Sequence, residues 1–412
     1  MKFLKNSLLL LAIQLLAVIS ASAQADENIL QQLRVDVVYL SSDLLQGRST
    51  GTEGERLAAR YIATRFEQIG LTPKGSDGGW FHKFNFDYKS NPHSEAPGEK
   101  RTGQNVVAYL DNGADNTVII GAHYDHLGMG DFGSLHTGQP DIHNGADDNA
   151  SGVASMLYLA EALKNSEIKN NNYLFIGFSG EEMGLFGSKN FTMTPTIDLK
   201  KVNYMVNMDM VGRLNAEKVI VINGVGTSPS WKEALPKINS ELKINTSDSG
   251  IGPSDHTSFY LQDIPAIHFF TGQHSDYHKP ADDSELVNYE GIAEVSEYIF
   301  SLIKILDGQG KLTFTKTKDE DQGRKAAAFK VSLGVMPDYV YQGEGMRIDG
   351  VTEDKPAANA GLEKGDIVIK IGDIDVKNIY DYMEGLSKFK KGDTARVAVK
   401  RGDKVMVKNV TF

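Results

Sequence analysis

Apolar runs of strand length recur along the first three quarters of the chain, and each ends in polar residues. The runs begin at Thr117, Tyr173, Tyr204 and Ala266. Between the first two, residues 153–163 carry apolar side chains at three- and four-residue steps, which is the spacing of an amphipathic helix. Near-continuous apolar strands that alternate with such helices predict an α/β fold whose mostly parallel central sheet is covered by helices on both faces. Ligands of such sheets bind beyond the carboxyl ends of the strands.

The pattern changes after residue 310, and we expect a second unit there. Residues 311–329 are charged and lack periodicity, so they predict a linker between a first domain at 24–310 and a second at 330–412. The second domain has short strands and one expected helix. Its valines alternate on both sides of the turn at residues 401–403, which predicts a β-hairpin.

The first 23 residues have the three parts of a secretory signal peptide. Lys2 and Lys5 precede an apolar stretch at 8–19, and small residues at 21–23 supply a cleavage site. The apolar stretch is shorter than the ~20 residues that cross a bilayer. We therefore expect an exported protein, periplasmic or secreted, with no membrane span after signal cleavage.

Composition narrows the chemistry further. The 412-residue chain has 43 Lys and Arg against 54 Asp and Glu, so its formal charge is −11. An acidic protein repels nucleic acid, and we expect no nucleic-acid partner. The chain has no Cys. Disulfides and thiolate chemistry are thereby excluded, and any metal must be held by His, Asp and Glu.

Five residues of metal-ligand type follow the strand ends or the loops between them: His123, Asp148, Glu182, Asp209 and His278. The first four are separated by roughly one strand–helix or strand–loop unit each, so they can meet at one edge of the sheet. This set predicts a pair of divalent cations about 3.5–4 Å apart that share a carboxylate. Zinc suits these ligands, with manganese or cobalt as substitutes. A further carboxylate is needed as general base for a water molecule.

Each block also has a purely structural explanation when it is taken alone. Residues 145–152 have the composition of a helix cap, and residues 181–182 resemble a solvated acidic pair. Asp209, by contrast, lies inside an apolar strand, where an unpaired carboxylate is costly. The order of all the blocks together favours the metal site over these separate explanations.

The blocks resemble the signature of the co-catalytic di-zinc exopeptidase family, which includes secreted bacterial aminopeptidases, glutamate carboxypeptidases and glutaminyl cyclases. The resemblance covers roughly residues 30–307. It is carried by residues 123–128, 144–152, 179–184, 207–212 and 277–280, with further matches at 40–52 and 252–256.

The resemblance implies the zinc exopeptidase fold and two zinc ions. Asp148 would bridge them, His123 and Asp209 would complete one site, and Glu182 and His278 would complete the other.

Roles for further residues follow from the same resemblance. Glu181 is implied as the general base, which also protonates the leaving amine. Tyr277 is implied as a donor to the oxyanion, and Asp125 as the residue that orients the imidazole of His123. The peptide bond at 148–149 is implied to be cis.

The C-terminal unit resembles a PDZ domain at residues 333–339, 355–362 and 364–366. The implied loop for a peptide carboxylate comprises Leu333, Gly334, Val335 and Met336, beside an edge strand that can accept an added strand. A domain without a ligand, or one that docks on its own catalytic face, remains open at this point.

The leading prediction is an aminopeptidase that acts on peptides, with a PDZ domain that binds a protein or peptide C-terminus. A glutaminyl cyclase of the same fold is an alternative, although those members keep a single zinc. A carboxypeptidase needs a cation for the substrate carboxylate, and Arg213 is the candidate. A non-catalytic PDZ-based peptide-binding protein is the fourth reading. Asp255 and His256 are expected to line the pocket without a catalytic role.

Overall fold

The computed structural model describes residues 27–88, 98–136, 138–317, 331–337, 341, 343–351 and 355–412. The expected signal peptide at 1–23 lies outside these residues. Within the described residues, no helix combines the length and the apolar character that a membrane crossing requires.

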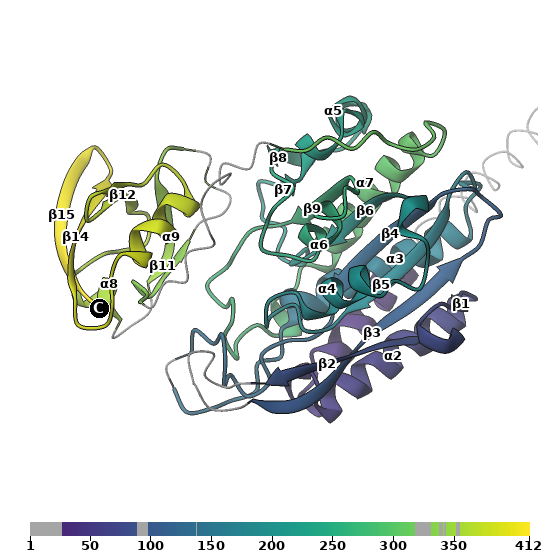
Figure 1. The fold of residues 1–412 in the computed structure, drawn as a ribbon, viewed down its shortest axis with the longest axis horizontal. Coiled ribbons are helices and arrows are strands. Elements are labelled where there is room, and N and C mark those ends of the chain that lie inside the picture. The colour runs from purple at the N-terminus through teal and green to yellow at the C-terminus, as the bar shows by residue number, and fades with distance from the viewer. Residues whose placement is uncertain are drawn as a thin grey trace, which may run out of the picture.

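The larger unit is built on one nine-stranded sheet (Figure 1). Its strands are β1 (Thr72–Pro73), β2 (Phe81–Tyr88), β3 (Glu99–Leu110), β4 (Thr117–His123), β5 (Asn172–Phe178), β6 (Val202–Met208), β7 (Val219–Asn223), β8 (Lys243–Ser247) and β9 (Ala266–Phe270). They lie in the order β1–β3–β5–β4–β6–β9–β7–β8, with β2 also paired to β3. The central strands β5, β4, β6 and β9 are parallel, whereas β3 and β7 beside them are antiparallel.

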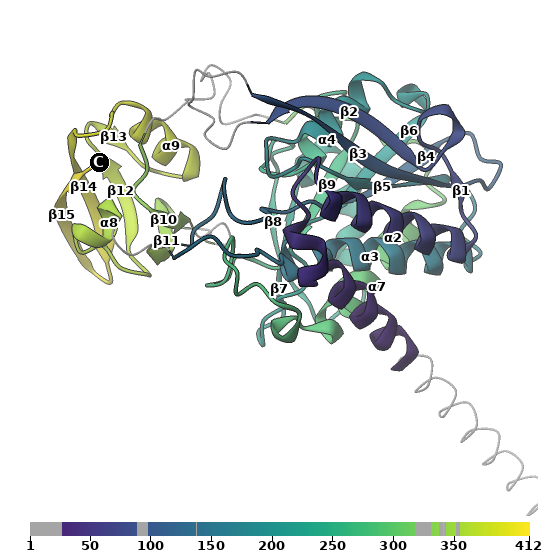
Figure 2. The ribbon, with the colours of Figure 1, turned by 90° about the horizontal axis from the view of Figure 1, so that it is seen from below.

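Helices cover both faces of this sheet, which confirms the predicted α/β class. They are α2 (Glu53–Ile69), α3 (Gly152–Lys164), α4 (Phe186–Met193), α5 (Pro229–Ala234), α6 (His256–Tyr260) and α7 (Tyr289–Leu306), preceded by helical residues 27–40. Figure 2 shows α2, α3 and α7 together on one face. Side chains of β4 alternate between two cores: Val118 and Ile120 pack with these three helices, and Ile119 packs with α4 and α6.

The larger unit extends further along the chain than the sequence pattern predicts. Residues 311–317 were expected in the linker, but Leu312 is buried in the large core. Thr317 is also buried, and its backbone N–H donates to the hydroxyl of Tyr260 at 3.1 Å. A charged sequence with two inward-facing side chains can pack as an extended segment without showing any periodicity.

The C-terminal unit has its own sheet and its own core (Figure 1). Its elements are β10 (Val335–Pro337), β11 (Met346–Val351), α8 (Pro356–Asn359), β12 (Ile367–Ile371), β13 (Ile374–Asp375), α9 (Ile379–Ser387), β14 (Thr394–Arg401) and β15 (Lys404–Thr411). The strand order is β10–β11–β12–β14–β15, with β13 on β12. Strand β10 therefore lies at an edge of this sheet.

The predicted hairpin is present as β14 and β15, although its two strands differ in burial. Val397 and Val399 are fully buried, whereas Val405 and Val407 are 61% and 50% exposed. The register explains the difference, because Val399 faces Met406 and Val397 faces Lys408. The valines of the second strand thus lie on the outer face of the sheet.

Candidate metal centre and active site

The predicted metal ligands meet at one edge of the sheet, beyond the carboxyl ends of its central strands. His123 is the last residue of β4, and Asp209 is the first residue after β6. Glu182 lies in the turn that follows β5, and His278 lies in the loop between β9 and α7. This is the edge at which parallel sheets bind their ligands.

Asp148 reaches the same place from the turn at Ala146–Ser151, which leads into α3. The neighbouring Asn149 fixes this turn, because its amide nitrogen donates to the Met208 carbonyl at 3.0 Å and its amide oxygen accepts from the N–H of Gly152 at 3.0 Å. The sequence block is therefore a helix cap as well as a ligand-bearing turn. The 148–149 peptide bond is cis, as the resemblance implied.

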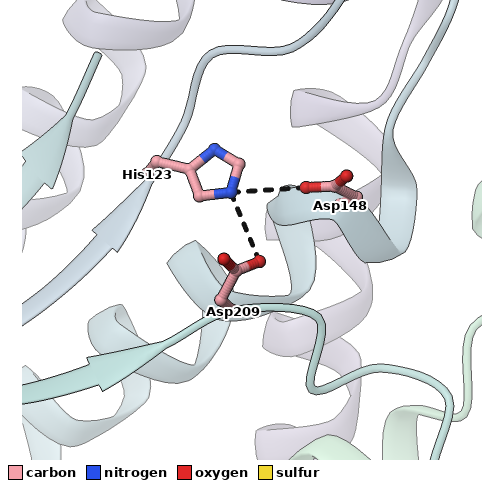
Figure 3. A group of neighbouring side chains, drawn as sticks. All are labelled: His123, Asp148 and Asp209. Carbon is pink, nitrogen blue, oxygen red and sulfur yellow. Dashed lines mark hydrogen bonds and ion pairs between the residues drawn. The ribbon is translucent and has the colours of Figure 1, made fainter. Parts of the chain in front are cut away.

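A first group of ligand atoms is formed by His123, Asp148 and Asp209. The Nε2 atom of His123 lies 3.3 Å from Oδ1 of Asp148 and 3.3 Å from Oδ1 of Asp209. Figure 3 shows the three side chains pointing toward one another from β4, from the turn before α3 and from the end of β6. One ligand atom from each lies within 4.8 Å of the others, which is close enough for a single ion.

A second group shares Asp148 with the first. The Nε2 atom of His278 lies 3.2 Å from Oδ2 of Asp148 and 3.1 Å from Oε2 of Glu182. His126 approaches the same carboxylates, with its Nδ1 atom 2.7 Å from Oε1 of Glu182. His126, Asp148 and Glu182 themselves have the geometry of a metal-binding group.

His126 is the functional residue that the sequence argument missed. It lies in the same 123–128 block as His123, but spacing alone does not predict which side chains of that turn point toward the metal-binding residues. Its Nε2 atom is buried and has no hydrogen-bond partner. Two histidines therefore flank the pair formed by Asp148 and Glu182.

The donor set fits zinc. Asp148, Glu181, Glu182 and Asp209 converge in a largely buried region, and adjacent carboxylates are costly there unless cations compensate them. All the nearby donors are imidazole nitrogens or carboxylate oxygens, which is a combination that zinc accepts.

The two neighbouring acids Glu181 and Glu182 have opposite electrostatic environments. Burial raises the pKa of Glu181 well above its usual value, and the carboxylates of Asp209 and Glu182 add to the rise. Burial acts in the same direction on Glu182, but the charge of His278 and a hydrogen bond from His126 bring its pKa down to about 2. The two acids thus differ in environment: histidines contact Glu182, whereas burial dominates at Glu181.

Asp125 connects this base to the histidine ligand. Its carboxylate accepts the backbone N–H of Glu181 at 3.2 Å and the hydroxyl of Thr50 at 3.1 Å. The Nδ1 atom of His123 lies 3.7 Å from the Asp125 carboxylate and 3.3 Å from its carbonyl oxygen. Asp125 is fully buried. Its side chain holds the backbone of the predicted base, and its carbonyl oxygen is the nearer contact of the predicted ligand His123.

A cavity of about 560 Å³ opens onto the metal-facing carboxylates. Tyr277 lines it, with its ring stacked on that of His278 at 3.8 Å between centroids. Beside Asp209, three further lining residues form a small apolar cluster: Met210, Val221 and Phe270. The C-terminal unit contributes Tyr341, Asn378 and Met383 to the lining.

Asp255 and His256 do not line this cavity, contrary to the expectation. Both are completely buried, because α6 begins at His256 and the preceding turn faces the interior. The His256 ring stacks on His268 at 4.7 Å, and it is His268 that lines the cavity. Burial raises the pKa of Asp255 to about 7 and lowers that of His268 to about 4.

Arg213 does not point into the cavity as a free cation. Its Nη2 atom lies 3.2 Å from Oδ2 of Asp276 and 3.3 Å from Oδ1 of Asp282, and the side chain is only 16% exposed. Arg213 is also not among the residues that line the cavity. The charge of Arg213 is thus compensated by the carboxylates of Asp276 and Asp282.

In the C-terminal unit, the predicted carboxylate loop leads into the edge strand β10. Leu333 is buried in the core, and its carbonyl oxygen accepts the N–H of Ala357 at 2.8 Å. Gly334 has a φ of +71°, and a Cβ there would lie 2.2 Å from Cβ of Lys355. Val335 and Met336 begin β10, for which β11 is the one strand partner within the described part of the chain. The backbone thus has the arrangement that accepts an added peptide strand.

Comparison with known proteins supports this description. Residues 105–303 match the model of peptidase family M28, and residues 315–411 match the PDZ domain. The chain is 31% identical over 205 residues to the "Alkaline phosphatase isozyme conversion protein" of Escherichia coli (strain K12), which covers 48% of this chain and 54% of that protein. It is 29% identical over 212 residues to "Leucine aminopeptidase 2" of Arthroderma otae. That match covers 48% of this chain and 40% of the other protein. The chain thus spans about half the length of these relatives or less.

Solved structures share the fold of the larger unit. A zinc aminopeptidase from Bacillus subtilis superposes with a TM-score of 0.53 at 18% identity, covering 66% of this chain and 94% of that one. A glutaminyl cyclase from Porphyromonas gingivalis superposes with a TM-score of 0.54 at 17% identity, covering 68% and 98%. The family matches confirm the predicted resemblance, and these structures confirm the fold of the larger unit. The chain therefore contains a domain of peptidase family M28 followed by a PDZ domain.

Proposed function

We propose that this protein is an exported aminopeptidase that uses two zinc ions to remove N-terminal residues from peptides. The observation that carries the proposal is the sharing of Asp148 between two ligand groups, His123 with Asp209 and Glu182 with a histidine. A shared carboxylate is the arrangement by which proteins hold two adjacent divalent cations.

Bound zinc would supply an activated water and an electrophile for the scissile carbonyl. Glu181 would take the proton of that water and pass it to the leaving amine. Two features support this role: Asp125 fixes the backbone of Glu181, and burial raises the pKa of its side chain. Tyr277 lines the cavity beside His278, where a hydroxyl donor could stabilise the oxyanion.

Removal of residues from the N-terminus is favoured over removal from the C-terminus. A carboxypeptidase needs a cation for the substrate carboxylate, and Arg213 is held by Asp276 and Asp282. Among the described residues that line the cavity there is no Lys or Arg. Recognition of a free α-amino group, by contrast, requires no cationic side chain in the cavity.

The side chain of the removed residue would be uncharged and largely apolar. Met210, Val221 and Phe270 form a wall next to the ligand Asp209. Apart from Tyr277 and Tyr341, the ionisable residues among the described lining are four proposed ligands, the proposed base and His268, whose pKa burial lowers to about 4. A charged side chain would therefore find no partner away from the metals.

We further propose that the PDZ domain binds peptide C-termini and brings substrates to the cavity. The free edge of β10 beside Gly334 supports strand addition. Tyr341, Asn378 and Met383 of this domain line the same cavity as the proposed ligands. The leader-like composition of residues 1–23 supports export to the periplasm or beyond.

A substrate panel with purified full-length protein tests the proposed reaction. We expect zinc-dependent release of the chromophore from an apolar aminoacyl substrate, none from its N-acetylated analogue, and loss of activity with a chelator. Hydrolysis of an N-blocked peptide from its C-terminus would reject the aminopeptidase in favour of a carboxypeptidase. Cyclisation of an N-terminal glutamine without hydrolysis would identify a glutaminyl cyclase.

A further inference from the structure

A second group of buried charges lies behind the metal-facing carboxylates, and the proposed reaction does not use it. We call it the rear ion cluster: Asp147, Arg213, His274, Asp276 and Asp282. The Nε2 atom of His274 lies 3.2 Å from Oδ2 of Asp147, and its Nδ1 atom lies 3.7 Å from Oδ2 of Asp276. Asp147 and Asp282 are completely buried, and the His274 side chain is 12% exposed.

The rear ion cluster is connected directly to the backbone of the shared ligand. One carboxylate oxygen of Asp282 accepts the N–H groups of both Asp147 and Asp148, each at 3.0 Å. The carboxylate of Asp147 accepts the N–H of Gly212 at 2.6 Å, three residues beyond the ligand Asp209. The position of Asp148 is therefore set by side chains that do not themselves face the metal.

Members of the cluster come from three segments, and each segment carries a different proposed ligand. The turn before α3 carries Asp147 and presents Asp148, and the segment after β6 carries Arg213 and follows Asp209. The loop after β9 carries His274 and Asp282 and presents His278. The contacts of His274 join the first of these segments to the third.

The balance of charges indicates that His274 is the member of the cluster whose loss would most affect Asp147. Three carboxylates share two cationic groups, and Arg213 contacts Asp276 and Asp282 but is not paired with Asp147. His274 is the ring that reaches Asp147. Burial lowers the pKa of His274, but Asp147 and Asp282 outweigh burial, so the pKa is raised overall. Without the imidazole, Asp147 would keep only its hydrogen bonds to neutral donors.

We propose that His274 is a positioning residue for the metal centre: by holding Asp147, it fixes both the turn that presents Asp148 and the loop that presents His278. His274 belongs to neither metal-binding group and is not itself among the residues that line the cavity. The inference rests on the proposed metal centre and adds a residue that controls metal affinity from outside it.

Zinc affinity of His274 variants in the full-length protein tests the proposal. Loss of a residue that orients a ligand typically weakens metal binding about 10–100-fold. We expect His274→Gln and His274→Ala to bind zinc weaker by that factor, measured by competition with a chromogenic chelator. The KM for an aminoacyl substrate at saturating zinc should stay unchanged. Added imidazole should restore zinc affinity to His274→Ala, which has room for it, but not to His274→Gln.

His136→Gln is the matched control, because His136 is exposed and outside the rear ion cluster, and this variant should bind zinc normally. If the His274 variants fold poorly, Asp276→Asn replaces them, and we expect a loss of less than tenfold from this more exposed position. Unchanged zinc affinity in the folded variants would overturn the proposal, and so would a lower melting temperature of zinc-free protein without a change in zinc affinity. Chelator competition needs no substrate, so an inactive protein that still shows the His274 effect would reject only the proposed aminopeptidase.

Discussion

Buried acids have different surroundings in the PDZ domain and at the proposed metal centre. In the PDZ domain, Asp366 is buried against Arg401, with Oδ1 and Nε 2.6 Å apart, and Asp381 accepts the N–H of Lys377 at 2.9 Å. In the peptidase domain, the carboxylates of Asp148, Glu181 and Glu182 converge on one another. A buried acid with its own partner contributes to stability, whereas buried acids that face each other indicate a place for cations. The difference therefore marks the proposed metal centre, because other buried acids of the peptidase domain, such as Asp36 beside Arg65, also have partners of their own.

The strongest expected effect is that of Glu181→Gln. The amide keeps the shape of the carboxylate but cannot accept a proton, so activity should fall by about 10⁴-fold or more, because general-base catalysis alone contributes about 10²–10⁴-fold. Zinc content should stay the same. Rate at saturating zinc and zinc stoichiometry are measured together, and loss of zinc from this variant would mean that Glu181 is a ligand.

Asp148→Asn should disturb both ligand groups at once, because each uses one oxygen of this carboxylate. We expect the zinc content to fall below one ion per chain under conditions where the unmodified protein holds two. Elemental analysis after zinc reconstitution checks this. A variant that still holds two ions, or an unmodified protein that holds only one, would reject the shared centre.

Glu182→Gln is the counterpart of Glu181→Gln. It removes a negative ligand, so zinc affinity should fall by at least the 10–100-fold typical of disturbing a metal ligand from outside, and excess zinc should restore part of the activity. Activity is titrated against free zinc. The assignment of the two acids is reversed if this variant keeps its zinc while Glu181→Gln loses it.

Asp366→Asn tests how much a buried acid with its own partner contributes to the stability of the PDZ domain. Loss of the hydrogen bonds to Arg401 should destabilise the PDZ domain by about 1 kcal/mol without changing zinc content, because Arg401 is 33% exposed and solvent screens the pair. Burial raises the pKa of Asp366, but Arg401 outweighs it, so the folded-state pKa is lowered. The pair therefore stabilises fully above about pH 4, and this contribution is lost as the pH falls further. Thermal melts of Asp366→Asn are compared with Asp375→Asn, whose partner is on the surface and whose effect should be small.

Removal of residues 330–412 should have the smallest effect on a short aminoacyl substrate, because no proposed ligand or base lies there. We expect rates within about twofold of full length, since catalysis depends on groups that touch the reacting atoms. Longer peptides with a free C-terminus should be cleaved less well. A folded, zinc-loaded truncation that cannot cleave the short substrate would show that the cavity residues Tyr341, Asn378 and Met383 are needed for the reaction.

Much of the fold and the ligand set could be predicted because both correspond to local sequence patterns. A buried strand is a run such as 117–122, and a ligand at its end is the first polar residue after that run. The sequence shows His126 in the same block as His123, but it does not give the direction of the His126 side chain, because the turn after β4 is irregular. The rear ion cluster could not be predicted from the sequence, because Asp147, His274 and Asp282 each look like ordinary polar loop residues. Only in the folded chain does the Nε2 atom of His274 lie within 4 Å of both carboxylates.

Residues 311–317 and the valines of β15 show the limits of composition. The first segment is polar overall, yet two of its side chains pack inward. Val405 and Val407 have the alternation of a core strand, but the register with β14 places them outside. In both cases a partner distant in sequence decides which side is buried.

The metal centre described above contains only nitrogen and oxygen donors, and the chain has no Cys. Thiolates are the groups that peroxides and alkylating reagents attack first, so neither reagent has a sulfur ligand to remove from this centre. The oxidisable atoms in the cavity are the thioethers of Met210 and Met383. Conversion of Met210 to its sulfoxide would make the apolar wall polar while leaving every proposed ligand intact. Oxidation of Met210, which is 4% exposed, would therefore alter the proposed side-chain preference without removing a proposed ligand, and Met383, at 37% exposed, is the more accessible thioether.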